Sequence, residues 1–171
     1  SRCLVGSEMC IRDSDYSAKR RELAELMGAD EIVDPSVTSP YSTWEEQAAY
    51  GLDGKLMPSD PIAGQKFRQG VIFECVGIPG VIDQIMVGVQ RNCRIVVVGV
   101  CMQPDQIRPL VAINKELSLQ FVLAYQPEEF AETLTNIAEG EIDVEPLITG
   151  TVGLAGVAEA FEDLANPEVH A

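Results

Sequence analysis

Two apolar runs decide the fold: Val71-Ile72-Phe73-Glu74-Cys75-Val76, residues 71–76, and Arg94-Ile95-Val96-Val97-Val98-Gly99-Val100, residues 94–100. Both are rich in β-branched residues and lack strict alternation of apolar and polar positions, which is typical of parallel strands covered on both faces. Between the runs, apolar residues recur at helical spacing, namely Ile82, Ile85, Met86 and Val89. The sequence therefore predicts a strand–helix–strand unit.

The same alternation extends toward the amino terminus. Ser17 is a good N-cap for a helix through Met27, and Gly28 follows at the position where a left-handed conformation costs little. Residues 31–34 read as a short strand, and residues 44–50 as a short helix. Proline and glycine are frequent in residues 51–69, which indicates a long connection without an assignable role.

Toward the carboxyl terminus, residues 117–124 predict another strand, and a helix begins with Pro127 at its first position and ends at Gly140. We expect its apolar residues to face inward: Phe130, Leu134 and Ile137. Apolar spacing in residues 157–164 predicts a final helix. Alternating buried strands and amphipathic helices predict an α/β fold with a doubly wound, mostly parallel sheet.

In such a fold, ligands bind beyond the carboxyl ends of the strands. The candidate positions are Asp15, if a strand precedes it, then Cys75-Val76-Gly77, and then Val98-Gly99-Val100. A carboxylate at the end of the second strand is suited to accept hydrogen bonds from both hydroxyls of a ribose, and it repels a 2′-phosphate. Asp15 occupies that position.

Each candidate also has a plainer interpretation. On residue type alone, an aspartate at position 15 more often belongs to the start of the following helix than to a ribose site, and Gly77 and Gly99 can simply end strands. Glu74, inside an apolar run, is best explained as a carboxylate paired near a strand end. The cluster Lys19-Arg20-Arg21 is typical of a solvated helix face.

Length and composition limit the function further. The 171 residues fit about one domain, and the net charge of −15 disfavours binding to a nucleic-acid backbone. No apolar run approaches the length of a membrane-spanning helix. Five cysteines without a CxxC pair favour a reducing cytoplasm and disfavour a zinc site within this chain. The single histidine, His170, leaves no triad for nucleophilic catalysis.

The opening residues 1–14 fit neither a helical nor a strand period for long. Residues 6–14 resemble translated sequencing-adapter DNA, so we expect residues 1–14 to be a non-native leader. Residues 15–171 would then be a partial dinucleotide-binding domain with a carboxy-terminal return segment.

Four blocks in this order resemble the cofactor-binding, Rossmann-like domain of the medium-chain, zinc-dependent alcohol dehydrogenases: residues 14–30, 73–80, 94–100 and 157–161. The resemblance implies that Asp15 binds the adenosine ribose and that Arg20 also touches it, which favours NAD over NADP. It implies that Cys75, Val76 and Gly77 pack along the adenosine half. The backbone of Val98, Gly99 and Val100 would meet the nicotinamide carboxamide, with Phe121 and Leu123 near a further carboxamide contact.

The departures from the family matter equally. No GxGxxG pyrophosphate loop precedes Asp15, and the family's amino-terminal catalytic domain with its zinc ligands has no counterpart. The resemblance thus implies a fold truncated at the amino-terminal side. In the strand order 3-2-1-4-5-6, loss of strand 1 would leave strand 71–76 with an open edge.

The expected function is that of a carboxy-terminal fragment, inactive alone, of an NAD-dependent, zinc-binding dehydrogenase. The parent would transfer a hydride between nicotinamide and a small alcohol or carbonyl substrate, bind zinc outside this chain, and form a homo-oligomer. Two alternatives stay open: a non-catalytic nucleotide-binding module, and a zinc-free quinone or enoyl reductase of the same superfamily.

Overall fold

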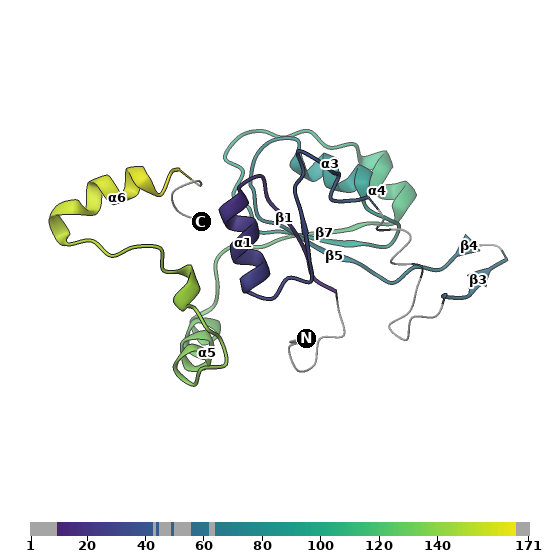
Figure 1. The fold of residues 1–171 in the computed structure, drawn as a ribbon. Helices are drawn as coiled ribbons and strands as arrows, with labels where there is room; N and C mark the ends of the chain where they lie inside the picture. The colour runs from purple at the N-terminus through teal and green to yellow at the C-terminus, as the bar shows by residue number, and fades with distance from the viewer. Residues whose placement is uncertain (1–9, 43, 45–48, 50–55, 62–63, 167–171) are drawn as a thin grey trace. The chain divides into compact units, whose positions relative to one another are not determined.

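The computed structural model describes residues 10–42, 44, 49, 56–61 and 64–166. These residues form two compact units (Figure 1). One unit contains the described residues up to Pro40 and from Tyr125 onward, and the other contains those from Tyr41 to Ala124. Most of the helix expected at residues 44–50 lies outside the described residues.

The central unit, Tyr41 to Ala124, is built on a parallel sheet in the order β5-β6-β7. The strands are β5 (Val71–Glu74), β6 (Arg94–Val97) and β7 (Ser118–Phe121). In register, Phe73 lies opposite Val96, and Val96 lies opposite Gln120. The predicted strand–helix–strand unit and the parallel α/β class are therefore confirmed.

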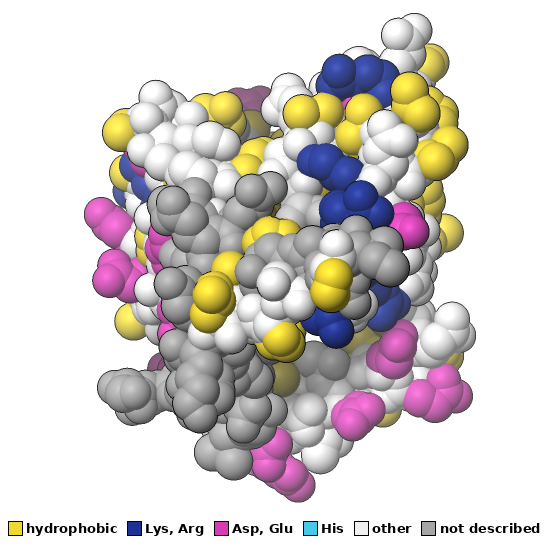
Figure 2. Space-filling view, turned by 90° about the vertical axis from the view of Figure 1, so that its right-hand side faces the viewer, with side chains coloured by type: hydrophobic (Ala, Val, Ile, Leu, Met, Phe, Trp, Pro, Cys, Tyr) yellow, Lys and Arg dark blue, Asp and Glu magenta, His cyan; other side chains and the backbone are white. Residues whose placement is uncertain are grey.

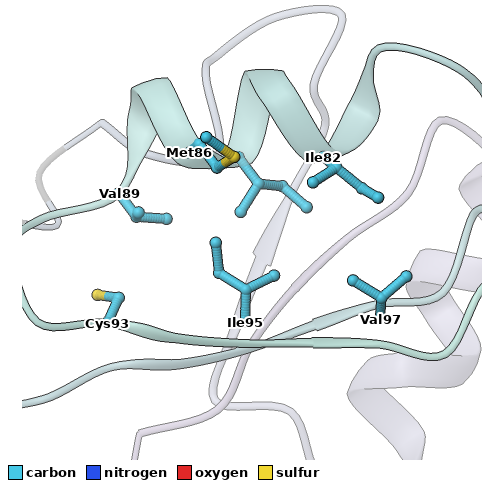
Figure 3. Close-up of a cluster of buried hydrophobic side chains, with 7 residues drawn as sticks. Ile82, Met86, Val89, Cys93, Ile95 and Val97 are labelled. Carbon is cyan, nitrogen blue, oxygen red and sulfur yellow. The ribbon is translucent and has the colours of Figure 1, made fainter. Parts of the chain in front are cut away.

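Two helices lie over one face of this sheet, α3 (Val81–Gly88) and α4 (Pro109–Lys115) (Figure 1). Apolar side chains of α3 and of the segment after it point toward side chains of β6 and of the residue before it (Figure 3). The buried cluster consists of Ile82, Ile85, Met86, Val89, Cys93, Ile95 and Val97. Every apolar residue that predicted the helix by its spacing belongs to this core.

Helix α4 falls in a passage for which we predicted no element. It begins with Pro109 at its first position and ends with Lys115, whose Nζ donates to the backbone oxygens of Val87 and Val89 at 2.6 and 2.5 Å. The lysine thereby satisfies carbonyl groups at the end of α3, where a positive charge also complements the helix dipole. This contact joins the end of α4 to the end of α3, and Val111 and Ala112 of α4 pack against the same apolar core.

The strands are shorter than predicted: β5 ends at Glu74 and β6 at Val97, whereas the runs continue to Val76 and Val100. Beyond Glu74, backbone N–H groups bond to the Glu74 side chain instead of to a neighbouring strand. Within the described residues β5 pairs with β6 alone, and Phe73 is 66% exposed. The connection 51–69 also holds an antiparallel hairpin of β3 (Ser59–Asp60) and β4 (Gly64–Gln65).

The other unit begins with two short parallel strands, β1 (Arg12–Ser14) and β2 (Glu31–Val33), joined through α1 (Ala18–Leu26). As predicted, Ser17 is the N-cap, and its side chain accepts a bond from the backbone N–H of Arg20 at 3.4 Å. Gly28 has a φ of +106°, so its lack of a side chain permits the turn out of the helix. A strand therefore does precede Asp15.

The carboxy-terminal part of this unit is helical but poorly buried. It contains α5 (Pro127–Ala138), α6 (Val157–Asp163) and two short 3-10 turns, η1 (Glu145–Leu147) and η2 (Leu154–Gly156). Pro127 occupies the first helical position as predicted, but Phe130 and Leu134 are more than half exposed. The expectation that they face inward is wrong: Phe130 stacks on the ring of Tyr125, and both side chains stay largely exposed.

Candidate functional site

The carboxyl ends of β5 and β6 meet through two glycines in the central unit. Gly77 has a φ of +70°, and a Cβ placed on it would lie 2.6 Å from the backbone nitrogen of Val100. A Cβ on Gly99 would likewise collide with the backbone nitrogen and Cα of Gly77. The structure thus brings the predicted segments 75–77 and 98–100 into direct backbone contact, which any larger residue at these positions would prevent.

Glu74 connects these two segments. Its side chain is almost completely buried, and its Oε1 accepts the backbone N–H groups of Val76 and Gly77 at 2.7 and 2.8 Å. Its backbone oxygen accepts N–H groups from Val98 and Gly99, both at 2.8 Å. The interpretation of Glu74 as a paired carboxylate at a strand end is confirmed, and its partners are backbone amides.

Around this contact, the carboxyl end of the sheet exposes apolar side chains. Val76 is 62% exposed, Val98 43% and Val100 70%, while Leu123, after β7, is 89% exposed. Cys75 and Phe121 are exposed as well. Apolar side chains with a few polar backbone groups beside them are typical of the lining of small-molecule sites.

Asp15 lies in the other unit, directly after β1. Its Oδ1 accepts the backbone N–H of Ser17 at 2.8 Å, and its Oδ2 is 3.7 Å from Nη1 of Arg20. The Asp15 side chain is 31% exposed and that of Arg20 48%. The helix-start interpretation of Asp15 is therefore confirmed, since its carboxylate caps the turn into α1. Ribose binding by Asp15 stays a prediction.

The neighbouring Arg21 is not a solvated helix residue, which corrects our interpretation of the Lys19-Arg20-Arg21 cluster at this position. Its Nη1 donates to the backbone oxygens of Asp15 and Tyr16 at 2.7 and 2.8 Å, and its Nη2 pairs with Asp34 at 2.9 Å. Arg21 is thus committed to the turn after β1 and to the end of β2. Among these two arginines, Arg20 is the more exposed.

Two carboxylates near the site have perturbed pKa values. Burial, reinforced by the negative charge of Asp15, raises the pKa of Asp13 in β1. Hydrogen bonds from Ser36 hold the pKa of Asp34 below its ordinary value, and the charge of Arg21 adds to this. The two shifts therefore have opposite directions, and each follows from the partners of that carboxylate.

Two contacts that hold the loop after β6 were not predicted from the sequence. Asp105 accepts the backbone N–H of Gly80 at 2.8 Å, and Arg108 forms an ion pair with Asp83 at 2.7 Å. Each pair is separated by 25 residues. No local pattern relates residues so far apart, so only the fold reveals them.

Among the described residues, no group of three or more histidine, cysteine, aspartate or glutamate side chains is placed to hold a metal ion. In the described part of the chain, no helix combines the length and the apolar character needed to cross a membrane.

Comparison with known families and structures gives consistent results. A family model described as zinc-binding dehydrogenase matches residues 11–139. The 2-dehydro-3-deoxy-L-galactonate 5-dehydrogenase of Pseudoalteromonas atlantica is 28% identical over 165 residues, which are 96% of this chain and 43% of that protein. The chain therefore spans less than half the length of this relative.

Two solved structures with this fold have a bound cofactor. A protein described as a short chain alcohol dehydrogenase from Escherichia coli CFT073, complexed with NADH, has a TM-score of 0.71 at 20% identity. The match covers 94% of this chain and 42% of that chain. A putative zinc-binding dehydrogenase from Sinorhizobium meliloti 1021, bound to NADP, has a TM-score of 0.59 at 21% identity and matches 81% of this chain and 37% of that chain. These similarities confirm the Rossmann-like fold class.

Proposed function

Because this chain belongs to the medium-chain, zinc-binding alcohol dehydrogenase family, we propose that it is the nicotinamide-binding part of an NAD-dependent oxidoreductase. The whole enzyme would act on a small alcohol or carbonyl substrate, as a homo-oligomer. When bound, NAD supplies a ring that accepts or returns a hydride. This chain would hold and orient that cofactor, and the substrate would be held by residues outside it.

The observation that carries the proposal is the chemistry of the strand ends. The Asp15 carboxylate follows a parallel strand, and its side chain is 31% exposed, so we expect it to accept hydrogen bonds from ribose hydroxyls. In the central unit, exposed apolar side chains of Val76 and Val100 flank the contact between Gly77 and Gly99. Such a surface suits the flat faces of adenine and nicotinamide.

The zinc of the proposed whole enzyme would be bound outside this chain. The described residues offer no ligand group for it, so we assign no step of the reaction to a metal held by this chain. We expect the purified chain, with or without added zinc, to produce no NADH from alcohols. Zinc-dependent NADH production by the purified chain would contradict the proposal that zinc and substrate are bound outside it.

NAD rather than NADP is proposed because of Asp15. A 2′-phosphate beside this carboxylate would bring two negative charges together. Arg20 acts in the opposite direction, since a guanidinium can pair with a phosphate, but its exposed side chain can turn toward solvent. Arg21 is held by Asp15, Tyr16 and Asp34, so it adds little to phosphate binding.

The test is titration calorimetry of the chain with NADH and with NADPH. We expect NADH to bind more tightly to the wild type. Asp15→Gly should shift the preference toward NADPH by about 1–3 kcal/mol, the range for loss of a charge-assisted contact. Arg20→Ala is the matched control and should shift the preference toward NADH. A wild-type preference for NADPH, or an unchanged ratio in Asp15→Gly, would refute the assignment of Asp15.

A further inference from the structure

Glu74 is an unusual residue for the interior of this sheet. Its side chain is 3% exposed, yet none of the ion pairs among the described residues includes it. A buried carboxylate without partners is strongly unfavourable. Here the compensation comes from the N–H groups of Val76 and Gly77, at 2.7 and 2.8 Å from the same oxygen.

These two bonds determine where the backbone goes after β5. Without them, the N–H groups of Val76 and Gly77 would need other partners, and the chain could continue along the sheet as its β-rich sequence favours. With them, the chain turns immediately after Glu74 and places Gly77 against Gly99. The side chain of Glu74 thus fixes the first segment.

The second segment is fixed from the same residue. The backbone oxygen of Glu74 accepts the N–H groups of Val98 and Gly99, which ends β6. A Cβ on Gly99 would lie 2.8 Å from the second carboxylate oxygen of Glu74, so that oxygen packs directly on the Gly99 backbone. Both segments proposed to contact the cofactor are therefore positioned by one residue.

A catalytic role for Glu74 does not fit its burial, because a general acid or base must reach the reacting atoms. We propose instead that Glu74 is a positioning residue for the cofactor. Its carboxylate holds the backbone of Val76 and Gly77 in register with Gly99, so that both strand ends present one preformed surface. This inference rests on the proposed cofactor-binding function.

The variants are chosen to separate hydrogen bonding from charge and size. Glu74→Gln keeps a side-chain oxygen that can accept both N–H groups, whereas Glu74→Met keeps the length and removes the acceptor. Glu74→Asp keeps the charge but shortens the side chain, and it serves if the methionine variant does not fold. Glu116→Gln, at an exposed carboxylate of the same unit, is the matched control.

Two measurements on the 171-residue chain test the proposal: hydrogen exchange of the Val76 and Gly77 amides without ligand, and the Kd for NADH. In Glu74→Met and Glu74→Asp, we expect these amides to exchange about tenfold faster and the Kd for NADH to rise about tenfold, as for loss of one to two hydrogen bonds. Exchange at Met86 and Ile95 should stay unchanged. Glu74→Gln should restore both values to near wild type, and Glu116→Gln should alter neither.

The outcomes distinguish this inference from the proposed function. Unchanged exchange at Val76 and Gly77 overturns the inference, whether or not NADH binds. Faster exchange with an unchanged Kd for NADH also overturns it, because Glu74 would then only shape the turn. If the wild-type chain binds no NADH while exchange behaves as expected, the proposed function fails, and the cofactor role of Glu74 fails with it.

Discussion

Helix α3 of the central unit and helix α5 of the other unit are both amphipathic but have different surroundings. Ile82, Ile85 and Met86 of α3 are buried against β6, whereas α5 has no buried residue. Locally α5 is the better specified helix, since Pro127 occupies its first position and Glu129 accepts the backbone N–H of Gln126 at 2.6 Å. Local sequence therefore decides that a helix forms, and a covering partner decides whether it is buried.

The same contrast extends to the surface. Exposed apolar side chains occur throughout α5 and α6, including Phe130, Leu134 and Phe161. Figure 2 shows one face of the molecule, on which hydrophobic side chains lie among basic and acidic ones. In the central unit such exposure includes the carboxyl ends of the strands, where we place the cofactor.

The largest expected effect comes from the core of the central unit. Met86 is fully buried, so Met86→Ala should lower the free energy of unfolding of this unit by about 2–5 kcal/mol, the range for deletion of a buried large side chain. This loss of stability is measured by urea denaturation, with hydrogen exchange of the β6 amides as the readout. Val87→Ala, on the exposed side of the same helix, is the control. Equal losses in the two variants would show that α3 is not packed as described.

The contact between the strand ends should give the next largest effect. Gly99→Ala places a methyl group against the backbone of Gly77 and should destabilise the central unit by about 1–3 kcal/mol, as overpacking does. Gly153→Ala is the matched control, because a Cβ there meets no atom within 4 Å. Thermal melts of both variants measure this loss. A Gly99→Ala melting curve that coincides with that of the wild type would contradict the close approach of the Gly77 and Gly99 backbones.

Polar contacts replace apolar burial in α1, which has no buried residue. Arg21→Met removes the bonds to Asp15, Tyr16 and Asp34 and should destabilise the β1–α1–β2 segment by about 1–2 kcal/mol. The measurement is hydrogen exchange of the β1 and β2 amides. Arg20→Met should change it much less, since the Arg20 side chain is nearly half exposed. The reverse order would mean that the roles of the two arginines are exchanged.

A smaller effect should depend on pH. Hydrogen bonds from Arg108 hold the pKa of Asp83 below its ordinary value in the folded chain. The pair therefore stabilises the fold fully above the ordinary aspartate pKa of about 4, and this contribution is lost as the pH falls through the lower folded value. Denaturant midpoints of wild type and Asp83→Asn should differ at pH 7 and converge in acid. A difference that grows in acid would contradict the assigned direction.

The smallest effect is expected on α5. Leu134 is 58% exposed, so Leu134→Ala should change the free energy of unfolding by no more than about 0.5 kcal/mol. Circular dichroism during urea denaturation is sufficient to compare it with Met86→Ala. A loss of several kcal/mol would mean that the face of α5 is covered in solution.

Sequence patterns predicted the elements better than their ends. The parallel strands, α3 and the Ser17 cap followed from apolar spacing and capping residues, because these signals are local. The predicted strands at residues 71–76 and 94–100 are too long, because Glu74 accepts hydrogen bonds from the backbone N–H groups that a longer strand would donate to its neighbour. Residue propensities do not describe this competition between a side chain and a neighbouring strand.

Helix α4 was not predicted from the sequence, although Pro109 and Lys115 mark its start and end. For the candidate site, the sequence predicted that segments 75–77 and 98–100 end neighbouring strands, and the structure brings them into contact. The sequence could not show that Arg21 bonds to the backbone of Asp15 and pairs with Asp34. An arginine in a basic cluster has the same neighbours in sequence whether it is solvated or paired.

We place the nicotinamide cofactor at the carboxyl ends of the parallel strands, and not on the exposed helices of the carboxy-terminal segment. Titration of the ¹⁵N-labelled chain with NADH, followed through its backbone amides, tests this placement most directly. We predict chemical-shift changes at Gly77 and Gly99, and also at Asp15, while Gly140, Gly153 and Gly156 in the carboxy-terminal segment stay unchanged. Shifts confined to those three glycines, or none at Gly77 and Gly99 at millimolar NADH, would contradict the claim.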